Sequence, residues 1–587
     1  MVDIQCDSPN HALVNFKQVM TIIDERGASL ADFVCSVDNN DRLAFLGGTV
    51  TDGVGKVLYR FKEKDLKRTE YSEYLSIDES IHYIDYTPPF YPVTITYEWA
   101  IDYNDKIMEF PQFCPQMDYE VSVGKAHYSL TAPKQMAVRY YLHNIHHDIT
   151  LVDSPGDTEK FILELDSLSP IYHESYALPF SELCPKAIFA PSEFVYCGTK
   201  GSLSSWKDYG LWEYSLIDGT EILPDEACRY IHKLTDSLAT AREKIEALYS
   251  ELAKNTRYVA ILLGIGGQKP AHASSVWQKG YGDCKGLSNY MRAMLKEIGI
   301  TSYYVTVSTK NKRLIPEFAS IGQIDHAILE IPLDKDTLWL ECTNPQLPLG
   351  YIQKNIAGHD AIEISPNGGR MINIPAYASH ENLKHSTINM HIDEKGNANI
   401  DMCQQYRNLR YEQYSYLLRL DKKELYRQLH DIIDVPQADI AKIDLRQDGA
   451  SIYLETAMTS TQYAIVTGNR LFIPICPLYI DCFTPLYQQE RHGDMWFPAG
   501  YYDEVEITIL IPDGYIIESV PADVEQELPF GTFSLDVSND EHKIIIKNHL
   551  QINAGRYDKE LFSDFVEFTR KVLSMYNKKI VIKKELI

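Results

Sequence analysis

Apolar and polar positions alternate through most of the first 215 residues. In "VTITYEWAIDY", every second residue from Val93 to Tyr103 is apolar or aromatic, and most of the residues between them are polar. A period of two residues is typical of a strand with one buried face. Similar runs, separated by Gly, Pro, Asn and Asp, predict an N-terminal β-sandwich.

The spacing changes to that of helices near residue 222. The segments "LPDEACRYIHKLTDSL" and "TAREKIEALYSELAKN" repeat apolar residues at steps of three and four, and in the second Ile245, Leu248 and Leu252 share one stripe. Both segments therefore predict amphipathic helices. Because they are adjacent in the chain, we expect them to open a new domain.

A further helix is predicted within "KGYGDCKGLSNYMRAMLKEIGI", residues 279 to 300. Leu287, Met291 and Leu295 recur at helical spacing, and Gly299 stands where a left-handed C-terminal cap is favoured. We therefore expect a helix that buries one face and begins close to Cys284.

Three strands are expected after this helix, in "TSYYVTVST", "DHAILEIPL" and "TLWLECT". The short connection "PLDKDT" between the last two favours an antiparallel pair. Helices followed by an antiparallel sheet are typical of an α+β domain.

Strand patterns return beyond residue 380, as in "EVEITILIP", and a helical patch interrupts them at "LDKKELYRQLHDII". Near the end, Phe562, Phe565 and Val572 mark an amphipathic helix that we expect to pack on the strands. The predicted fold class is thus a multidomain α+β protein. We expect an N-terminal β-sandwich in residues 1–218, an α+β core in 219–380 and a β-rich domain, a second sandwich, in 381–587.

Charge narrows the classes of partner. The 587 residues include 56 Lys and Arg against 82 Asp and Glu, which gives a formal net charge of −26. Such an acidic surface repels phosphate backbones and anionic lipid, so we expect no nucleic-acid partner. No apolar run approaches the roughly 18 residues that a transmembrane helix needs, so we expect no transmembrane segment.

The start of the chain, "MVDIQCDSPN", lacks the basic and apolar regions of a signal peptide. Two interpretations fit: a cytosolic protein, or a mature form from which a signal has been removed.

Cysteine and histidine spacing gives no metal site. The eleven cysteines are scattered without a Cys-x-x-Cys pair, and no carboxylate or cysteine follows "LHNIHHD" at a spacing typical of zinc. We expect neither a metal nor an organic cofactor. One or two disulfides are compatible with the count.

Cys284 is the strongest candidate for chemistry. A helix N-terminus carries unpaired N–H groups and partial positive charge, which favour a thiolate and can stabilise an oxyanion. The alternative to a nucleophile is that Cys284 is a small residue buried at the helix start, with a role in packing only. His326 opens the predicted strand "HAILEI", and Glu341 ends the next one. In an antiparallel pair these ends are neighbours, so a thiol, a base and an orienting carboxylate can meet.

The "GYGDCKGLSNYMRAMLKEIGI" segment, the histidine about forty residues later and the following acid together resemble the transglutaminase-like superfamily. This resemblance implies a papain-like core with Cys284 as nucleophile, His326 as general base and Glu341 as the acid. With "RYVAILLGIGG" and the flanking β regions, the chain resembles three-part envelope proteins of Bacteroides-type bacteria, in which the core lies between two domains of unknown function. A periplasmic or cell-envelope location follows from this resemblance alone.

One departure from the superfamily is Glu341, because these enzymes usually have aspartate there. Asp325 is a poor substitute, since it should point away from His326 in a strand. Gln278, six residues before Cys284, is the candidate for the second oxyanion donor, although a surface amide is the alternative. Gln268 and Trp277 are weaker candidates, and we expect Asp283 to shape the turn or cap the helix.

Two functions remain in view. The first is a cysteine protease or amidase that acts on a peptide or protein, such as one of the cell envelope, through a thioester. The second is an envelope binding or scaffold protein with little or no catalysis. Replacement of Cys284 by alanine separates them. The pattern leaves open the substrate, hydrolysis against transamidation, and the oligomeric state.

Overall fold

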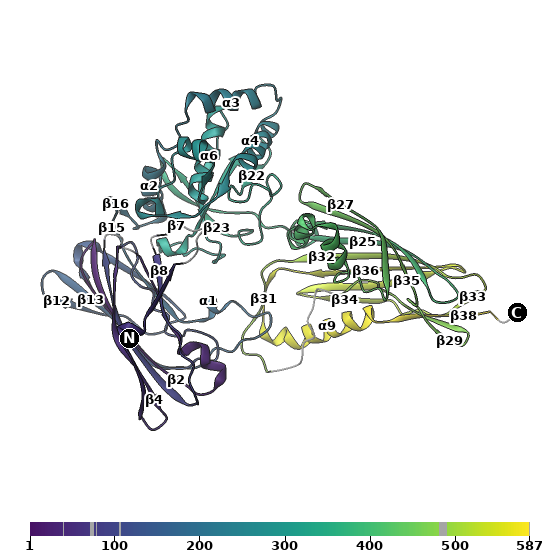
Figure 1. Cartoon of the computed structure of the whole chain (residues 1–587), viewed down its shortest axis with the longest axis horizontal. Coiled ribbons are helices and arrows are strands. Elements are labelled where there is room, and N and C mark those ends of the chain that lie inside the picture. The colour runs from purple at the N-terminus through teal and green to yellow at the C-terminus, as the bar shows by residue number, and fades with distance from the viewer. Residues whose placement is uncertain (39, 71–75, 78, 105–106, 480–489, 586–587) are drawn as a thin grey trace. The chain divides into compact units, whose positions relative to one another are not determined.

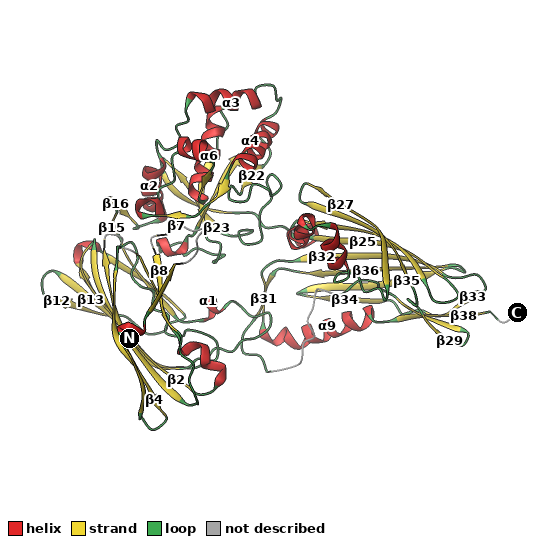
Figure 2. Cartoon of the chain, viewed as in Figure 1, coloured by secondary structure: helices red, strands yellow, loops and turns green. Residues whose placement is uncertain are grey.

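A computed structural model describes residues 1–585 except 39, 71–75, 78, 105–106 and 480–489. The chain forms two compact units (Figure 1). Unit 1 contains residues 1–172, 180–350 and 358–374, and unit 2 contains residues 173–179, 351–357 and 375–587. Figure 2 shows strands in both units, several helices in the central part of unit 1 and a long helix in unit 2.

The N-terminal part of unit 1 is built on an eight-stranded sheet in the order β12-β13-β10-β1-β2-β9-β4-β5. The predicted alternation is present in β9, where Val93, Ile95 and Tyr97 are fully buried. The strands are β1 (Val2–Ser8), β2 (His11–Ile22), β4 (Arg42–Asp52), β5 (Val57–Phe61), β9 (Val93–Asn104), β10 (Val123–Pro133), β12 (Thr150–Ser154) and β13 (Thr158–Leu168).

A smaller sheet covers part of this one, in the order β3-β8-β6. Phe33 of the small sheet and Tyr97 of β9 lie in one hydrophobic cluster, with ring centroids 5.3 Å apart. The prediction of a β-rich N-terminal region is therefore confirmed. The remaining strands here are β3 (Phe33–Asp38), β6 (Lys67–Glu70), β7 (Ser76–Ile77), β8 (Glu79–Ile84), β11 (Val138–His143), β14 (Lys186–Pro191), β15 (Glu193–Tyr196) and β16 (Thr199–Ser202), with a short helix α1 (Phe180–Leu183).

The central part of unit 1 is an α+β domain around a five-stranded antiparallel sheet, in the order β22-β21-β20-β23-β24. Its helices and this sheet share one hydrophobic cluster. The elements are α2 (Trp206–Ile217), α3 (Asp225–Thr235), α4 (Ala241–Asn255), α5 (Ala273–Lys279), α6 (Cys284–Glu297), β17 (Arg257–Tyr258), β18 (Ile261–Leu262), β19 (Tyr281–Gly282), β20 (Tyr303–Val307), β21 (His326–Pro332), β22 (Thr337–Leu340), β23 (Asp360–Ser365) and β24 (Gly368–Asn373).

Helix α2 was not predicted, because Gly210 and four aromatic residues in "WKDYGLWEYSLI" obscure a helical stripe. Gly210 allows the helix to approach the sheet closely, since a Cβ there would lie 1.9 Å from the backbone nitrogen of Gly369. The helix belongs to the same hydrophobic cluster as α6. The predicted division into three domains, at residues 1–218, 219–380 and 381–587, remains a proposal. The observed division is into two compact units.

Unit 2 has an eight-stranded sheet in the order β27-β28-β26-β25-β32-β36-β35-β34, in which β25 and β32 are parallel. The predicted C-terminal helix is α9, and Phe565 and Phe568 on its buried face contact Phe530. The elements are β25 (Leu383–Ile392), β26 (Ala398–Arg407), α7 (Leu409–Tyr414), α8 (Lys422–Leu429), β27 (Ala438–Asp448), β28 (Ser451–Ser460), β29 (Ile465–Thr467), β30 (Arg470–Pro474), β31 (Met495–Phe497), β32 (Tyr501–Leu510), β33 (Tyr515–Ser519), β34 (Val524–Leu528), β35 (Gly531–Asn539), β36 (Lys543–Ile552), β37 (Gly555–Tyr557), α9 (Phe562–Tyr576) and β38 (Lys579–Lys584).

The segment 173–179 belongs to unit 2 although its neighbours in the chain belong to unit 1. Buried Glu174 accepts hydrogen bonds from the backbone N–H groups of His492, at 2.7 Å, and Gly493, at 3.0 Å. The guanidinium of Arg491 donates to the carbonyl oxygen of Ser175 at 2.8 Å. The segment is thus held by backbone groups more than 300 residues later in the sequence.

Across the described part of the chain, the helices are too short or too polar to span a bilayer.

Candidate active site

Cys284 is the first residue of α6, as the hydrophobic spacing predicted. Asp283 precedes it as the N-cap, and its Oδ1 accepts the backbone N–H of Gly286 at 2.8 Å. The helix is anchored by a fully buried apolar stripe that includes Leu287, Met291 and Leu295. The partly exposed thiol therefore lies at a fixed helix N-terminus, among N–H groups that favour negative charge.

His326 is the first residue of β21, and Glu341 directly follows β22. The two strands are antiparallel, with Leu329 opposite Leu340. This pairing brings the two side chains together: Nε2 of His326 lies 2.7 Å from Oε2 of Glu341. Glu341 is buried, with its side chain 4% exposed, and His326 is partly buried, with its side chain 14% exposed.

Thr343 completes the surroundings of Glu341. Oε1 of Glu341 accepts the Thr343 backbone N–H at 2.8 Å and its hydroxyl at 2.5 Å. Burial would raise the pKa of Glu341, but the hydrogen bonds from His326 and Thr343 outweigh it and lower the pKa. Glu341 therefore stays ionised beside the imidazole.

His326 also hydrogen-bonds to Cys284. Since Nε2 contacts Glu341, Nδ1 is the ring nitrogen left for the thiol. Burial would lower the pKa of His326, but Cys284 and Glu341 outweigh it and raise the pKa from 6.5 to about 10. At neutral pH the imidazole accordingly holds its proton between the sulfur and the carboxylate.

One hydrogen bond joins α6 to β21, and another joins α4 to Glu341. The hydroxyl of Ser288, one turn into α6, donates to the carbonyl oxygen of Ala327 at 3.1 Å. The hydroxyl of Tyr249 in α4 donates to the carbonyl oxygen of Glu341 at 2.9 Å. The helix bearing the thiol is therefore tied to the strand bearing the imidazole.

A buried ion pair between Lys285 and Asp283 lies beside the thiol. Glu213 of α2 is fully buried nearby, and burial raises its pKa to about 8 although Lys285 acts to lower it. These residues lie far apart in the sequence and no local motif links them, so sequence reasoning did not find the cluster.

Tyr258 was also missed. It ends β17, which pairs in parallel with β19 so that Tyr258 lies opposite Gly282. Burial and the nearby Cys284, Asp283 and Glu341 raise the pKa of its hydroxyl to about 12. The hydroxyl near the thiol is consequently a hydrogen-bond donor at neutral pH.

The other predicted residues lie as follows. Gln278 is exposed in α5 and lines a cavity together with Trp277. Gln268 follows a short 3₁₀ turn at residues 264–267. Asp325 accepts both the backbone N–H and the hydroxyl of Thr309, at 2.7 and 3.0 Å, so it has a local partner of its own.

Comparisons with known proteins place the central segment in a family. Residues 229–343 match the transglutaminase-like superfamily and form a domain of that type. Residues 469–582 match a domain of unknown function for which a structure has been solved. No curated protein matches the chain.

The fold also resembles solved structures. A "putative protease" from Parabacteroides distasonis is 12% identical, with a TM-score of 0.67 over 99% of this chain and 98% of that one. A "putative cysteine protease" from Cytophaga hutchinsonii is 9% identical over 57% of this chain and 76% of that one, with a TM-score of 0.17. The first likeness shows that the fold, with β-rich regions before and after the central domain in the sequence, occurs in a solved structure.

Proposed function

From the match of residues 229–343 to the transglutaminase-like superfamily, we propose that this protein is a cysteine hydrolase that cleaves an amide bond of a peptide or protein. The observation that carries the proposal is the position of His326, between the Cys284 thiol and the Glu341 carboxylate. A base that contacts both a nucleophile and an orienting acid is the arrangement that activates a thiol.

In the acylation step, Cys284 is the nucleophile. His326 holds the thiol proton as an imidazolium paired with the thiolate, and the thiolate attacks the carbonyl carbon of the amide. The oxygen that becomes negative is stabilised by backbone N–H groups at the start of α6. When the carbon–nitrogen bond breaks, the imidazolium gives its proton to the leaving amine, and a thioester to Cys284 remains. Glu341 holds the ring and stabilises its charged form.

In the second step, a nucleophile cleaves the thioester. Water, deprotonated by His326, releases a carboxylic acid and regenerates the thiol, which makes the enzyme a peptidase or amidase. A lysine amine in place of water would make it a transglutaminase. We favour hydrolysis, because the sequence contains no recognisable acceptor-lysine site. The mechanism calls on no metal or organic cofactor.

A second oxyanion donor is open to two candidates. Gln278 remains the prediction from the superfamily resemblance, and it is exposed at the end of α5. The hydroxyl of Tyr258 is the alternative, because Tyr258 lies opposite Gly282, two residues before Cys284, in the pair of strands β17 and β19. Loss of turnover in Tyr258→Phe but not in Gln278→Ala would assign the role to Tyr258, and the opposite result to Gln278.

The test of the proposal is the alkylation rate of Cys284 by iodoacetamide between about pH 4 and pH 9, followed by peptide mass spectrometry. The exposed thiol of Cys403 is an internal control in the same molecule. We expect Cys284 to react far faster than Cys403 at about pH 6, and His326→Ala to remove that advantage.

If Cys284 stays inert until about pH 8.5, as an ordinary thiol does, the proposal is wrong. The protein would then be an envelope binding or scaffold protein whose core retains the fold without turnover. The periplasmic or envelope location itself rests on the family resemblance. It would be tested by fractionation of the source cells.

A further inference from the structure

A second concave site lies in the central domain, in a cavity of about 410 Å³ between α3, α4, α5 and α6. Three aromatic side chains line it: Tyr230, Trp277 and Tyr290. The rings of Tyr230 and Trp277 lie 5.7 Å apart between centroids, at an angle of 50°. The lining combines these aromatic rings with polar side chains, and a concave site of this size is large enough for a small molecule or a single side chain.

The acidic group in this cavity is the carboxylate of Glu251, which is 9% exposed; the other non-aromatic polar side chains of the lining are those of Asn255, Thr256, Gln278 and Lys279. It accepts hydrogen bonds from the side-chain amide of Asn255 and from the hydroxyl of Tyr230. Both partners donate, so the carboxylate is the acceptor in both hydrogen bonds.

Glu251 has no cationic partner within the part of the chain that the structure describes: no Lys, Arg or His forms an ion pair with it. Buried carboxylates in proteins are normally paired with a positive charge. Here the unpaired carboxylate borders a cavity that is large enough for a guest, so the missing charge can come from a ligand.

Aromatic walls suit the same kind of guest. A cation close to the faces of tyrosine or tryptophan rings is attracted by their negative electrostatic potential. The net charge of −26 adds a long-range attraction for basic molecules.

The cavity is also connected to the candidate nucleophile by two neighbouring chain segments. Asn255 and Thr256 line the cavity and lead directly into β17, while Gly280 lines it and leads into β19. The two strands are parallel, and Cys284 follows two residues after β19. Four residue steps separate Gly280 from Cys284, so at about 3.3 Å per residue the cavity lining lies within roughly 13 Å of Cys284 along the chain.

We propose that this cavity is a specificity subsite that binds the cationic side chain of a lysine or arginine in the substrate. The proposal rests on the hydrolase function and names its substrate class, a basic peptide. It does not make the cavity an acceptor site for transamidation, because an amine held charged by Glu251 at this distance from Cys284 is not a nucleophile toward the thioester.

The experiment measures binding without turnover, by isothermal titration calorimetry with the Cys284→Ala protein at neutral pH. The probe is N-acetyl-lysine N-methylamide, and N-acetyl-norleucine N-methylamide has the same side-chain length without the ammonium group. We expect the lysine compound to bind about tenfold more tightly or better, and Glu251→Gln to remove this preference. Equal affinity for the two compounds would overturn the proposal.

A second variant guards against misfolding of Glu251→Gln. Lys279 is exposed and lines the cavity, so Lys279→Gln removes a repelling charge and should tighten binding of the lysine compound about two- to threefold. Lys254→Gln is the matched control, since Lys254 is an exposed lysine on the same helix as Glu251. Weaker binding in Lys279→Gln than in Lys254→Gln would contradict a cation site.

The result of the calorimetric binding experiment is independent of the result of the alkylation test. A selective cation site together with an inert Cys284 would leave the subsite standing, as a basic-peptide binding site, and would reject the hydrolase. A reactive Cys284 without lysine selectivity would reject the subsite and keep the hydrolase.

Discussion

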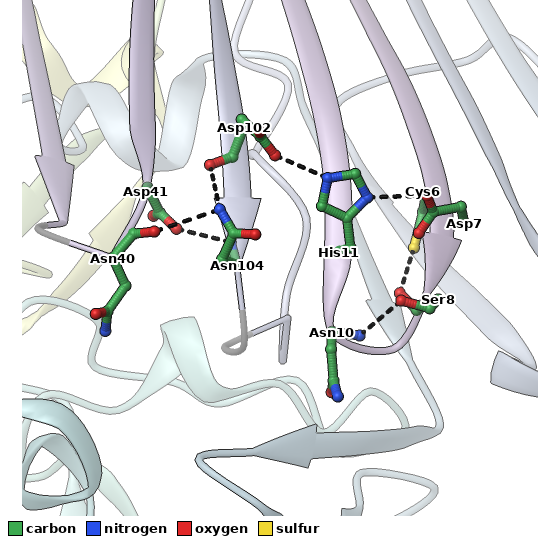
Figure 3. A network of polar contacts seen from close by, with 9 residues as sticks. All are labelled: Cys6, Asp7, Ser8, Asn10, His11, Asn40, Asp41, Asp102 and Asn104. Atoms are coloured by element: carbon green, nitrogen blue, oxygen red, sulfur yellow. Dashed lines mark hydrogen bonds and ion pairs between the residues drawn. The ribbon is translucent and has the colours of Figure 1, made fainter.

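His326 and His11 of unit 1 each lie beside acidic residues, with Cys284 near the first in space and Cys6 five residues before the second in the chain. At the candidate active site, His326 contacts Glu341 and Cys284. In the N-terminal sheet, His11 lies between Asp7 and Asp102, with Nδ1 2.9 Å from one carboxylate and Nε2 2.8 Å from the other (Figure 3). The two clusters use the same types of residue, so the difference between them lies in geometry.

The first difference lies in the hydrogen-bond partners of the two ring nitrogens. Both nitrogens of His11 are occupied by carboxylates, and its side chain is 38% exposed. His326 gives only one nitrogen to a carboxylate and is nearly buried. Only His326 therefore has a nitrogen available for a thiol.

The second difference is the cysteine. Cys6 is buried in strand β1, and burial raises the pKa of its thiol to about 12, despite a hydrogen bond to the carbonyl oxygen of Ser8. Cys284 is partly exposed at the start of a helix. The comparison teaches that a free ring nitrogen and a helix N-terminus, rather than the residue types alone, distinguish a candidate catalytic cluster from a structural one.

The largest effect is expected from the two cysteines. Cys284→Ala should reduce hydrolysis of a cleaved peptide by about a thousandfold or more, because the nucleophile is lost. Cys6→Ala should leave the rate within about twofold, since Cys6 takes no part in the reaction. Amine release from a peptide library, followed by mass spectrometry, measures both. Equal losses in the two variants would mean that the N-terminal cluster matters for catalysis.

The acids come next. Glu341→Gln removes the carboxylate that helps to raise the pKa of His326, so the pKa should fall and alkylation of Cys284 at about pH 6 should slow by roughly tenfold. Asp102→Asn is the matched change at His11 and should have no effect on Cys284.

Glu341→Asp tests whether this chain needs its longer acid. Glutamate reaches Nε2 of His326 at 2.7 Å, and aspartate is shorter by one methylene group. We therefore expect Glu341→Asp to alkylate at a rate between those of the wild type and Glu341→Gln. A rate at or above the wild-type value would show that the site adapts to aspartate.

The third effect is the dependence of the free energy of unfolding on pH. The pKa of His326 is about 10 in the folded protein and near 6.5 when unfolded, so its stabilising contribution is complete below about pH 6.5 and is lost as the pH rises through 10. Between these limits the free energy of unfolding should fall by about 2 to 4 kcal/mol more in the wild type than in His326→Asn. Urea unfolding at a series of pH values measures this difference, and parallel curves would contradict it.

The smallest effect is expected at His11. Its pKa is raised by the hydrogen bonds to Asp7 and Asp102, which outweigh burial, so its contribution also disappears with rising pH. Because the group is exposed and screened by solvent, His11→Asn should change the free energy of unfolding by less than about 0.5 kcal/mol. The change should vanish in high salt. A larger or salt-independent effect would show that the two clusters differ less than their geometry indicates.

Local patterns predicted much of this molecule. Alternation located β9, helical spacing located α6, and the short connection after β21 indicated the hairpin that brings His326 and Glu341 together. The residues around the site were not predictable, since Glu213 comes near Lys285, and Tyr258 near Cys284, only through tertiary packing. The parallel pairing of β25 with β32 was equally hidden, because alternation shows that a strand has a buried face but not which strand lies beside it.

The segment 173–179 has a consequence for synthesis on the ribosome. Translation delivers Glu174 early, but its partners, the backbone groups of His492 and Gly493, emerge more than 300 residues later. Until then, this stretch has no native partner for its carboxylate, while the residues on either side of it already belong to unit 1. In the nascent chain, the carboxylate of Glu174 therefore waits for its hydrogen-bond donors. Unit 2 can complete its folding only after its last strands have left the ribosome.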